Sequence, residues 1–496
     1  MIRPARRRLL AGFVLGALAA LGQAPFDIPI LMLVALVVAI RWGRSIRVPR
    51  RAAAYGWVFG FGYFSVALHW IVSPFLIDVA RHGWMAPFAL VFLAAGMALF
   101  WGAAFWGARL MSRRQWPLIL CLPAAELVRA YIFTGFPWAN FAQAMVDVKA
   151  GQGLALVGPY AMTLWLVATA VILSLRATGR PALLAGQVAL ALSSIALLVL
   201  PPRIEPAPLT DQVVRLIQPN SAQREKWDPE KLEMFYRRQI AYTAAPPTGE
   251  MPEPSLVIWP ETAIPWPLDL AQNVVEEISF SAAGRSVILG VQRRTQTRFF
   301  NSLVLLGPQG EIAQTYDKHH LVPFGEYMPL GELAAKFGIH GLAAQEGNGY
   351  SAGPGAVVIE VPGIGPVLPL ICYEAVFAHD VNAAPTRPNL IVQVTNDAWF
   401  GRAAGPEQHL AQARMRAIEQ GVPLARSANT GISAMVDPWG RVTHSLALNT
   451  AGYVDAVLPK PRSATLYSRW GDMPLAVLLL LGLLVGGTLA RRRDSD

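Results

Sequence analysis

The sequence predicts a polytopic α-helical membrane domain joined to an α/β domain, and three observations support this fold class. Of the 496 residues, 54% are hydrophobic and only 15% are charged, which is too apolar for an ordinary soluble protein. Long apolar runs occupy residues 1–205 and return at 473–490. Between them, segment 211–460 consists of short β-like runs separated by turn residues.

The formal charge of +10 is distributed unevenly along the chain. Segment 211–460 holds 19 basic and 24 acidic residues, and the rest of the chain holds 23 basic and 8 acidic residues. The basic residues therefore flank the apolar runs, which indicates membrane-flanking loops and no nucleic-acid-binding surface. Because one of the two cysteines lies in a predicted membrane helix, no disulfide framework is expected.

Seven apolar runs in the first 205 residues predict membrane-spanning helices, and the run at 473–490 predicts an eighth. The first run, Leu9 to about Ala24, follows a basic start that is also typical of a signal peptide. We interpret it as an uncleaved helix because another apolar run follows it, and no soluble domain does. The remaining runs lie at about 28–40, 52–75, 84–108, 116–133, 154–175 and 182–200.

Arginines fill every second connection between the predicted spans. These arginines are Arg3, Arg6, Arg7 and Arg8; Arg41, Arg44, Arg47, Arg50 and Arg51; Arg109, Arg113 and Arg114; Arg176 and Arg180; and Arg491, Arg492 and Arg493. Basic loops stay on the cytoplasmic side, so eight spans put both termini in the cytoplasm. Segment 211–460 is then expected to face outward, which in a Gram-negative cell is the periplasm.

Glu126 and Arg129 lie three residues apart inside the fifth predicted span, so they can pair on one helix face. A structural ion pair between helices and a role at lipid headgroups are both consistent with this spacing.

The α/β segment contains eight strand candidates and three helix candidates. The strand candidates are 213–218, 255–260, 285–292, 301–307, 311–317, 356–362, 367–373 and 389–396, and the helix candidates are Pro229–Ala241, Asp269–Ala283 and Pro406–Gly421. The last helix candidate begins with proline and stops at glycine, as helices commonly do. This pattern predicts two sheets covered by helices.

Three polar residues follow separate strand candidates and form a candidate catalytic set. Cys372 ends the apolar run of one strand, Glu261 follows the strand at 255–260, and Lys318 follows the strand at 311–317. A thiol becomes a strong nucleophile only when its surroundings stabilise the thiolate, which requires a base and a cation nearby. A lone cysteine in an apolar run is more often an inert core residue, and Cys121 fits that interpretation.

Three motifs, in this order, carry a resemblance to a known family: WPE at 259–261, DKHHLVPFGEY at 317–327 and ICYE at 371–374. The segment from about 213 to 458 resembles the nitrilase superfamily. The resemblance implies a four-layer α-β-β-α sandwich and a catalytic set of Glu261, Lys318 and Cys372. Glu326 resembles a second family glutamate that supports the lysine and the substrate.

The chemistry of the set suggests one role for each member. A general base needs an elevated pKa, and Trp259, Pro260 and Pro265 would supply apolar walls that raise the pKa of Glu261. Lys318 beside the thiol is expected to favour the thiolate and then to stabilise the tetrahedral oxyanion.

A closer resemblance covers essentially the whole chain. Several spans, a nitrilase-like segment and one final span together resemble the apolipoprotein N-acyltransferase family of Gram-negative inner membranes. The local stretches that agree are APFD at 24–27, GFPW at 135–138, QREKWD at 223–228 and CYE at 372–374.

This resemblance implies a ping-pong acyl transfer. Cys372 would take an acyl chain from a membrane phospholipid as a thioester and pass it to the N-terminal α-amine of a diacylglyceryl-cysteine apolipoprotein. Trp227, Tyr373 and Glu374 are implied as supporting or substrate-binding residues, and the N–H of Tyr373 as a second oxyanion donor. A thioester must be kept from water, and the segment Phe337–Tyr350 is either a cover for the site or a plain surface loop.

Two other functions use the same features. A membrane-anchored nitrilase-type amidase would need the catalytic set but only one span as an anchor. A transporter with an accessory outer domain would place polar residues at mid-membrane, whereas the pair at 126 and 129 lies near one end of its span.

No metal or cofactor is expected from the sequence. No metal-ligand spacing, phosphate-binding glycine loop or nucleotide motif is present. His319 and His320 are adjacent, and adjacent residues are poorly spaced for a shared metal on a helix or a strand.

Overall fold

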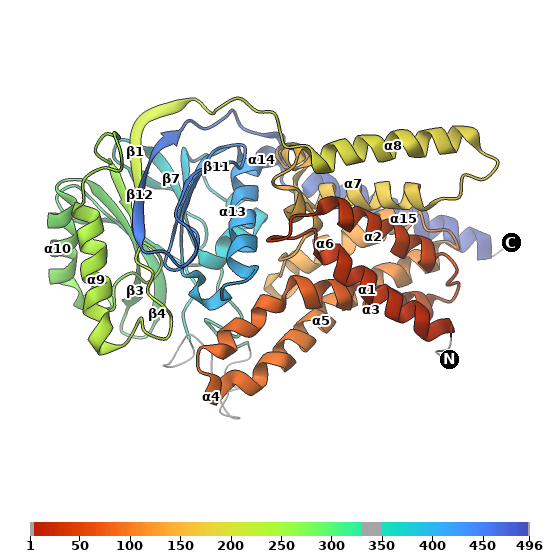
Figure 1. Ribbon diagram of the computed structural model, residues 1–496, viewed down its shortest axis with the longest axis horizontal. Coiled ribbons are helices and arrows are strands. Elements are labelled where there is room, and N and C mark those ends of the chain that lie inside the picture. Colours follow the sequence, from red (N-terminus) through yellow and green to blue (C-terminus); the bar gives the residue numbers. More distant parts are fainter. Residues whose placement is uncertain (1–3, 330–348, 495–496) are drawn as a thin grey trace. The chain divides into compact units, whose positions relative to one another are not determined.

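The computed structural model describes residues 4–329 and 349–494, and these form two compact units. The helical unit contains residues 1–204, 403–411 and 465–496, and the sheet unit contains residues 205–402 and 412–464. Each unit is described separately below, with element labels as in Figure 1.

The helical unit is built from eight longer helices. These are α1 (Pro4–Ala20), α2 (Pro29–Gly43), α3 (Pro49–Ala67), α5 (Ala86–Met111), α6 (Leu118–Tyr131), α7 (Leu154–Ser174), α8 (Pro181–Val199) and α15 (Met473–Asp494), with the short helices α4 (Val79–His82) and α14 (Leu466–Trp470) between them. Helices α2, α3 and α8 begin at a proline, whose fixed φ suits the first helical position and whose missing N–H costs nothing there.

Within the described residues, three helical stretches are long and apolar enough to cross a membrane: Val79–Met111, Lys149–Ser174 and Pro181–Val199. A fourth arises if α3 and the following 3-10 helix His69–Leu76, which are bent by 48°, count as one broken span. Pro29–Gly43 and Met473–Thr488 are shorter apolar helices. The prediction of eight spans therefore stays a prediction.

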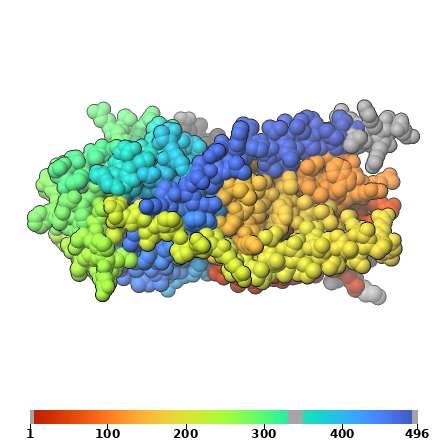
Figure 2. All heavy atoms as spheres, turned by 90° about the horizontal axis from the view of Figure 1, so that it is seen from above, coloured from red at the N-terminus to blue at the C-terminus, as the bar shows by residue number. Residues whose placement is uncertain are grey.

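Helix α8 presents apolar side chains to the surroundings of the protein. Leu184, Val188, Leu192 and Ile195 are each at least 44% exposed and recur at the spacing of one helix face. Figure 2 shows this helix, in yellow, along the surface of the helical unit. An apolar face of this kind suits contact with lipid chains.

A buried ion pair connects helices inside the helical unit. Arg129 Nη2 lies 2.6 Å from Glu126 Oε2, and the indole N–H of Trp101 donates to Glu126 Oε1 at 2.8 Å. Arg129 also donates to the carbonyl of Trp138 at 2.9 Å. These contacts link α6 to α5 and to the loop after α6, which supports the structural alternative for this pair.

Residues 403–411, which lie far along the chain, pack with the helical unit. The Gln408 amide donates to the carbonyls of Ala24 and Ala67 at 3.0 and 3.1 Å. Its oxygen accepts a hydrogen bond from the indole of Trp138 at 2.7 Å. Gln408 is 1% exposed, so these bonds satisfy a buried amide.

The sheet unit contains two six-stranded sheets with orders β12-β1-β2-β3-β4-β5 and β11-β10-β9-β8-β7-β6. The first contains β1 (Leu209–Gln218), β2 (Leu256–Ile258), β3 (Ser286–Arg294), β4 (Phe299–Leu306), β5 (Ile312–Asp317) and β12 (Gly452–Pro459). The second contains β6 (Ile359–Val361), β7 (Gly365–Ile371), β8 (Leu390–Thr395), β9 (Leu424–Ala428), β10 (Ala434–Val436) and β11 (Val442–Ser445).

Parallel strands form the centre of each sheet. Strands β1, β2 and β3 are parallel in the first sheet, and β7, β8 and β9 are parallel in the second. The outer strands pair antiparallel. Parallel strands deliver the residues that follow them to the same end of a sheet, and Glu261 and Cys372 follow the parallel strands β2 and β7.

The layers match the predicted sandwich. Apolar residues from both sheets form one core, including Leu216, Ile288, Ile371, Val392 and Met435. Helices α9 (Pro229–Ala244) and α10 (Gln272–Ala282) cover the other face of the first sheet (Figure 1). Helix α13 (Gly405–Gln420) lies beside the second sheet with its residues 412–420, so the α-β-β-α prediction is confirmed.

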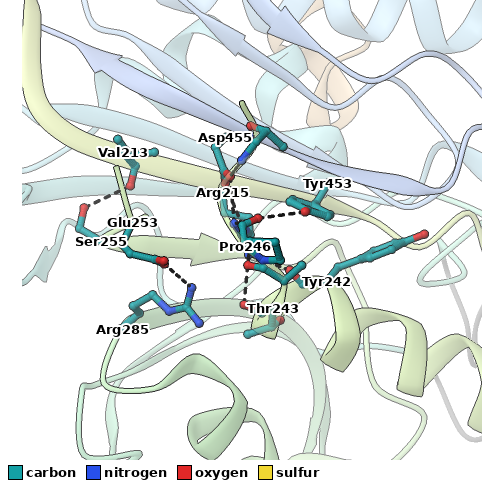
Figure 3. A network of polar contacts seen from close by, with 12 residues as sticks. Val213, Arg215, Tyr242, Thr243, Pro246, Glu253, Ser255, Arg285, Tyr453 and Asp455 are labelled. Carbon is teal, nitrogen blue, oxygen red and sulfur yellow. Dashed lines mark hydrogen bonds and ion pairs between the residues drawn. The ribbon is translucent and has the colours of Figure 1, made fainter. Parts of the chain in front are cut away.

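A buried ion pair joins the two ends of the sheet unit's chain. Arg215 of β1 and Asp455 of β12 lie opposite each other in the sheet, with Nε and Oδ1 2.8 Å apart and neither side chain exposed. The guanidinium also donates to carbonyls at the C-terminal end of α9 and just after it, including those of Tyr242, Thr243 and Pro246 (Figure 3). These bonds compensate the cost of burying the two charges.

Candidate active site

Cys372 is the first residue after β7, where the chain turns sharply into a 3-10 helix over Cys372–Val376. Its φ is 51°, a left-handed conformation that is strained for a side chain with a Cβ. The Cys372 carbonyl accepts a hydrogen bond from Gln393 Nε2 of β8 at 3.0 Å. The neighbouring strand thus holds this strained turn, and the cysteine is 6% exposed.

Glu261 follows β2 and has both carboxylate oxygens fixed. Oε1 accepts from the Asn301 amide at 2.7 Å, and Oε2 accepts from the backbone N–H of Asn396 at 2.8 Å. Gly290 of β3 permits the close approach of this segment, because a Cβ there would lie 2.5 Å from the Glu261 Cα. Burial raises the pKa of Glu261 above its ordinary value, although the charge of Lys318 opposes this.

Lys318 follows β5 and lies between two carboxylates. Its Nζ is 2.8 Å from Glu326 Oε2 and 3.8 Å from Glu261 Oε1, and the side chain is 1% exposed. Burial alone lowers the pKa of Lys318, but the charges of Glu326 and Glu261 outweigh it and hold the pKa above its ordinary value. The two carboxylates therefore favour the charged form of Lys318.

Glu326 forms an ion pair with Lys318, and two hydrogen bonds fix the Glu326 carboxylate. Its oxygens accept from the amide of Asn301 at 2.9 Å and from the backbone N–H of Val322 at 2.9 Å. Asn301 thus bonds both glutamates at once, which fixes the distance between the base and the support of the cation.

Burial and two neighbouring charges act on the pKa of the Cys372 thiol, and the two charges act in opposite directions. Burial raises its pKa, the charge of Glu261 raises it further, and Lys318 offsets these effects only in part. These effects together favour the thiol over the thiolate. Its activation requires proton transfer to a base, and Glu261 is the carboxylate whose charge acts on it most strongly.

Glu374 is buried at the site and connects two segments of the chain through hydrogen bonds. Its carboxylate accepts the backbone N–H of Ile371 at 2.7 Å, the backbone N–H of His319 at 2.8 Å and the hydroxyl of Tyr316 at 2.6 Å. It joins the turn after β7 to the segment after β5, which carry Cys372 and Lys318. Because all of these bonds are internal, they favour a supporting role over substrate contact.

Tyr373 and Trp227 lie in different surroundings. Tyr373 is 4% exposed and packs edge-on against Phe377, with ring centroids 4.8 Å apart. Trp227 is 41% exposed. The roles predicted for both residues stay predictions.

Lys226 and the two asparagines 301 and 396 were missed by the sequence analysis. Lys226 Nζ donates to the Glu261 carbonyl at 3.3 Å, and burial lowers the pKa of Lys226 to about 8, although the charge of Glu261 opposes this. The signal for Lys226 was its place beside Trp227 in the QREKWD stretch. Asn301 lies within β4, Asn396 follows β8, and neither carried a signal by itself.

The segment predicted as a cover for the site is Phe337–Tyr350. Its residues 337–348 lie outside the described residues. Tyr350 itself is described. Its hydroxyl accepts from Gln292 Nε2 at 2.6 Å, and its backbone N–H donates to the carbonyl of Glu326 at 2.9 Å.

Two family models match parts of this chain. Residues 213–465 match the carbon-nitrogen hydrolase family, so the sheet unit defines a protein of that class. Residues 15–172 match the apolipoprotein N-acyltransferase N-terminal domain.

Proteins named apolipoprotein N-acyltransferase are similar to this chain over nearly its full length. The identities are 35% with the Rhodopseudomonas palustris protein, 36% with that of Brucella melitensis and 37% with that of Bradyrhizobium diazoefficiens. Each comparison covers 98% of this chain and 96%, 97% and 95% of the respective relative. The chain belongs to the apolipoprotein N-acyltransferase family, and it is a membrane-associated acyltransferase.

Proposed function

We propose that this protein transfers a fatty acyl chain from a membrane phospholipid, through a thioester at Cys372, to the α-amine of a diacylglyceryl-cysteine apolipoprotein. The observation that carries this proposal is the buried cluster of Glu261, Lys318 and Cys372 in a chain of this family. A base, a fixed cation and a thiol are the groups that acyl transfer through a thioester requires.

In the first step, Glu261 takes the thiol proton as the sulfur attacks the ester carbonyl of the phospholipid. The ammonium of Lys318 stabilises the negative charge that develops on the carbonyl oxygen. When the C–O bond breaks, Glu261 returns the proton to the leaving alkoxide. The products are a lysophospholipid and the acyl-enzyme thioester.

In the second step, the α-amine of the apolipoprotein attacks the thioester carbonyl. Glu261 takes a proton from the amine, the C–S bond breaks, and the sulfur regains a proton as the thiol. The products are an amide and the free enzyme. Burial of the site supports this sequence, because the thioester must survive until the acceptor arrives.

Intact-mass measurement tests the first step. We expect purified protein mixed with phospholipid alone to gain one fatty acyl group, which neutral hydroxylamine removes. Addition of a diacylglyceryl-cysteine peptide should discharge it and yield N-acyl peptide. If no adduct forms until the peptide is added, the reaction passes through a ternary complex and the ping-pong proposal fails.

We also propose that residues 211–460 lie in the periplasm, with both termini in the cytoplasm and the protein in the inner membrane. The alternation of arginine-rich loops supports this arrangement. Reporter fusions after Arg47 and near Thr248 should report opposite compartments. A result that places both reporters on one side would overturn this topology.

A further inference from the structure

Three histidines and one aspartate gather beside the turn that carries Cys372. His319 and His320 follow Lys318 directly, and His379 and Asp380 lie in the short helix α12 (Ala378–Asn382). Asp380 is at the centre of the group. Its carboxylate oxygens are 2.7 Å from His320 Nδ1, 3.4 Å from His379 Nε2 and 3.8 Å from His319 Nε2.

The surrounding side chains fix the orientation of His320. Its ring stacks on Phe377, with centroids 3.6 Å apart and an angle of 17° between the planes. Tyr373 packs edge-on against the same imidazole at 5.7 Å. The Nε2 atom of His320 is buried and has no hydrogen-bond partner among the described residues. A buried ring nitrogen without a partner is costly in a purely structural cluster.

We propose that His320, His379 and Asp380 form a binding site for one divalent transition-metal cation of the Zn²⁺ class. One donor atom from each of these residues lies within 4.8 Å of the other two. Imidazole nitrogen and carboxylate oxygen are donors that Zn²⁺ takes at about 2.0–2.2 Å, usually in tetrahedral sites. Two such donors are then roughly 3.4 Å apart, which is the separation of His379 Nε2 and Asp380 Oδ1.

The donor types at the cluster agree with cation binding, because two imidazoles and one carboxylate converge there. The mixed nitrogen and oxygen set suits Zn²⁺ better than Mg²⁺ or Ca²⁺, which prefer oxygen alone.

His319 lies beside the proposed site but is not one of its three ligands. Its Nδ1 lies 2.9 Å from Glu374 Oε1, and its Nε2 lies 3.8 Å from Asp380 Oδ1. The sequence analysis found no metal-ligand spacing and discussed the adjacent His319 and His320, because nothing in the sequence joined them to α12.

A cation at this position would stabilise the catalytic segments against each other. His320 is two residues from Lys318, and Asp380 is eight residues from Cys372. The proposal does not depend on which acyl donor or acceptor the enzyme uses.

The test uses the untagged full chain in detergent, treated with a chelator and then freed of it. Titration with ZnCl₂ in a calorimeter should show one Zn²⁺ bound per chain, and Zn²⁺ should raise the Tm. His379→Ala and Asp380→Asn should each weaken binding at least about tenfold. Co²⁺ in place of Zn²⁺ should give a visible absorption band in the wild type that both variants lose.

His444→Ala is the matched control, because His444 lies on the edge strand β11 and belongs to no such cluster among residues 4–329 and 349–494. It should bind Zn²⁺ as the wild type does. The Tm of each variant without metal shows whether it is folded, and Asp380→Asn keeps the size of the side chain if His379→Ala does not fold. Absence of Zn²⁺ binding in the wild type, or equal binding in a folded His379 or Asp380 variant, overturns the proposal.

Discussion

Each unit of the protein buries one cysteine, and the two cysteines have very different neighbours. Cys121 lies in α6 of the helical unit, is 8% exposed, and its Sγ lies 3.7 Å from Met111 Sδ. Cys372 is 6% exposed, but it lies in a strained turn, and the charges of Glu261 and Lys318 act on the pKa of its thiol. The two cysteines are therefore about equally buried, but only Cys372 has neighbours that can activate its thiol. A base and a cation within reach make the difference, and burial alone does not.

The largest difference in acyl-transfer rate should appear between two variants in each of which one cysteine is replaced by alanine. Cys372→Ala should lower acyl transfer at least about 1,000-fold, because no other group can form the thioester. Cys121→Ala should leave the rate within about twofold and remove no step of the reaction. Radiolabelled acyl transfer to a diacylglyceryl peptide measures both variants. Substantial transfer by the Cys372 variant would sink the assignment of the nucleophile.

Removal of the base should have the next largest effect. Glu261→Gln keeps the size of the side chain but cannot take the thiol proton, so the rate of acyl-enzyme formation should fall by about 10²–10⁴-fold. The matched control is Glu233→Gln on the exposed face of α9, which should acylate normally. Single-turnover mass spectrometry with phospholipid follows the acylation. Normal acylation of Glu261→Gln would contradict the proposed role.

Asn301 offers a smaller test of how the base is held. Asn301→Ala removes the amide that bonds both Glu261 and Glu326, so each loses a hydrogen bond to its charged form. A loss of about 1.5 kcal/mol in transition-state stabilisation corresponds to a roughly tenfold slower acylation. The rate of thioester formation reports this effect. An unchanged rate would show that the backbone N–H of Asn396 suffices to orient Glu261.

The smallest expected effect is a shift in pH dependence. Glu261 must be ionised to act, so activity should fall as the pH drops through its raised pKa. The positive charge of Lys226 lowers the pKa of Glu261, and Lys226, with a pKa of about 8, is charged throughout that acidic range. Lys226→Met should therefore move the acidic limb of the pH–rate profile to higher pH. Lys226→Arg should keep it in place, and a limb that moves equally in both variants would exclude the charge effect.

The sequence predicted which polar residues follow the strands, but it did not predict all of the strands that surround them. Glu261, Lys318 and Cys372 were placed at strand ends by short apolar runs, and the structure brings all three together. Strands β9 to β12 were not predicted, because their runs are short or carry buried polar residues such as Arg426 and Asp455, which only tertiary partners make acceptable. The bend between α3 and His69 also left no clear sign in an apolar run predicted as one span over 52–75.

Residues that act through contacts across the fold were the hardest to predict. Asn301 bonds side chains 40 and 25 positions away in the sequence, and His320 meets Asp380 60 positions further along. Periodicity and motifs describe neighbours in sequence, so they contain no information on such pairs.

The pairing of Arg215 with Asp455 bears on the order in which the protein matures. The two residues are 240 positions apart, and β12 completes the edge of the first sheet beside β1. During synthesis, the guanidinium of Arg215 thus has to wait for nearly the whole sheet unit to leave the ribosome before its carboxylate partner exists. A nascent chain that stops short of residue 455 lacks the carboxylate partner of Arg215 and leaves the β1 edge of the first sheet open, so we expect truncated chains to fold poorly.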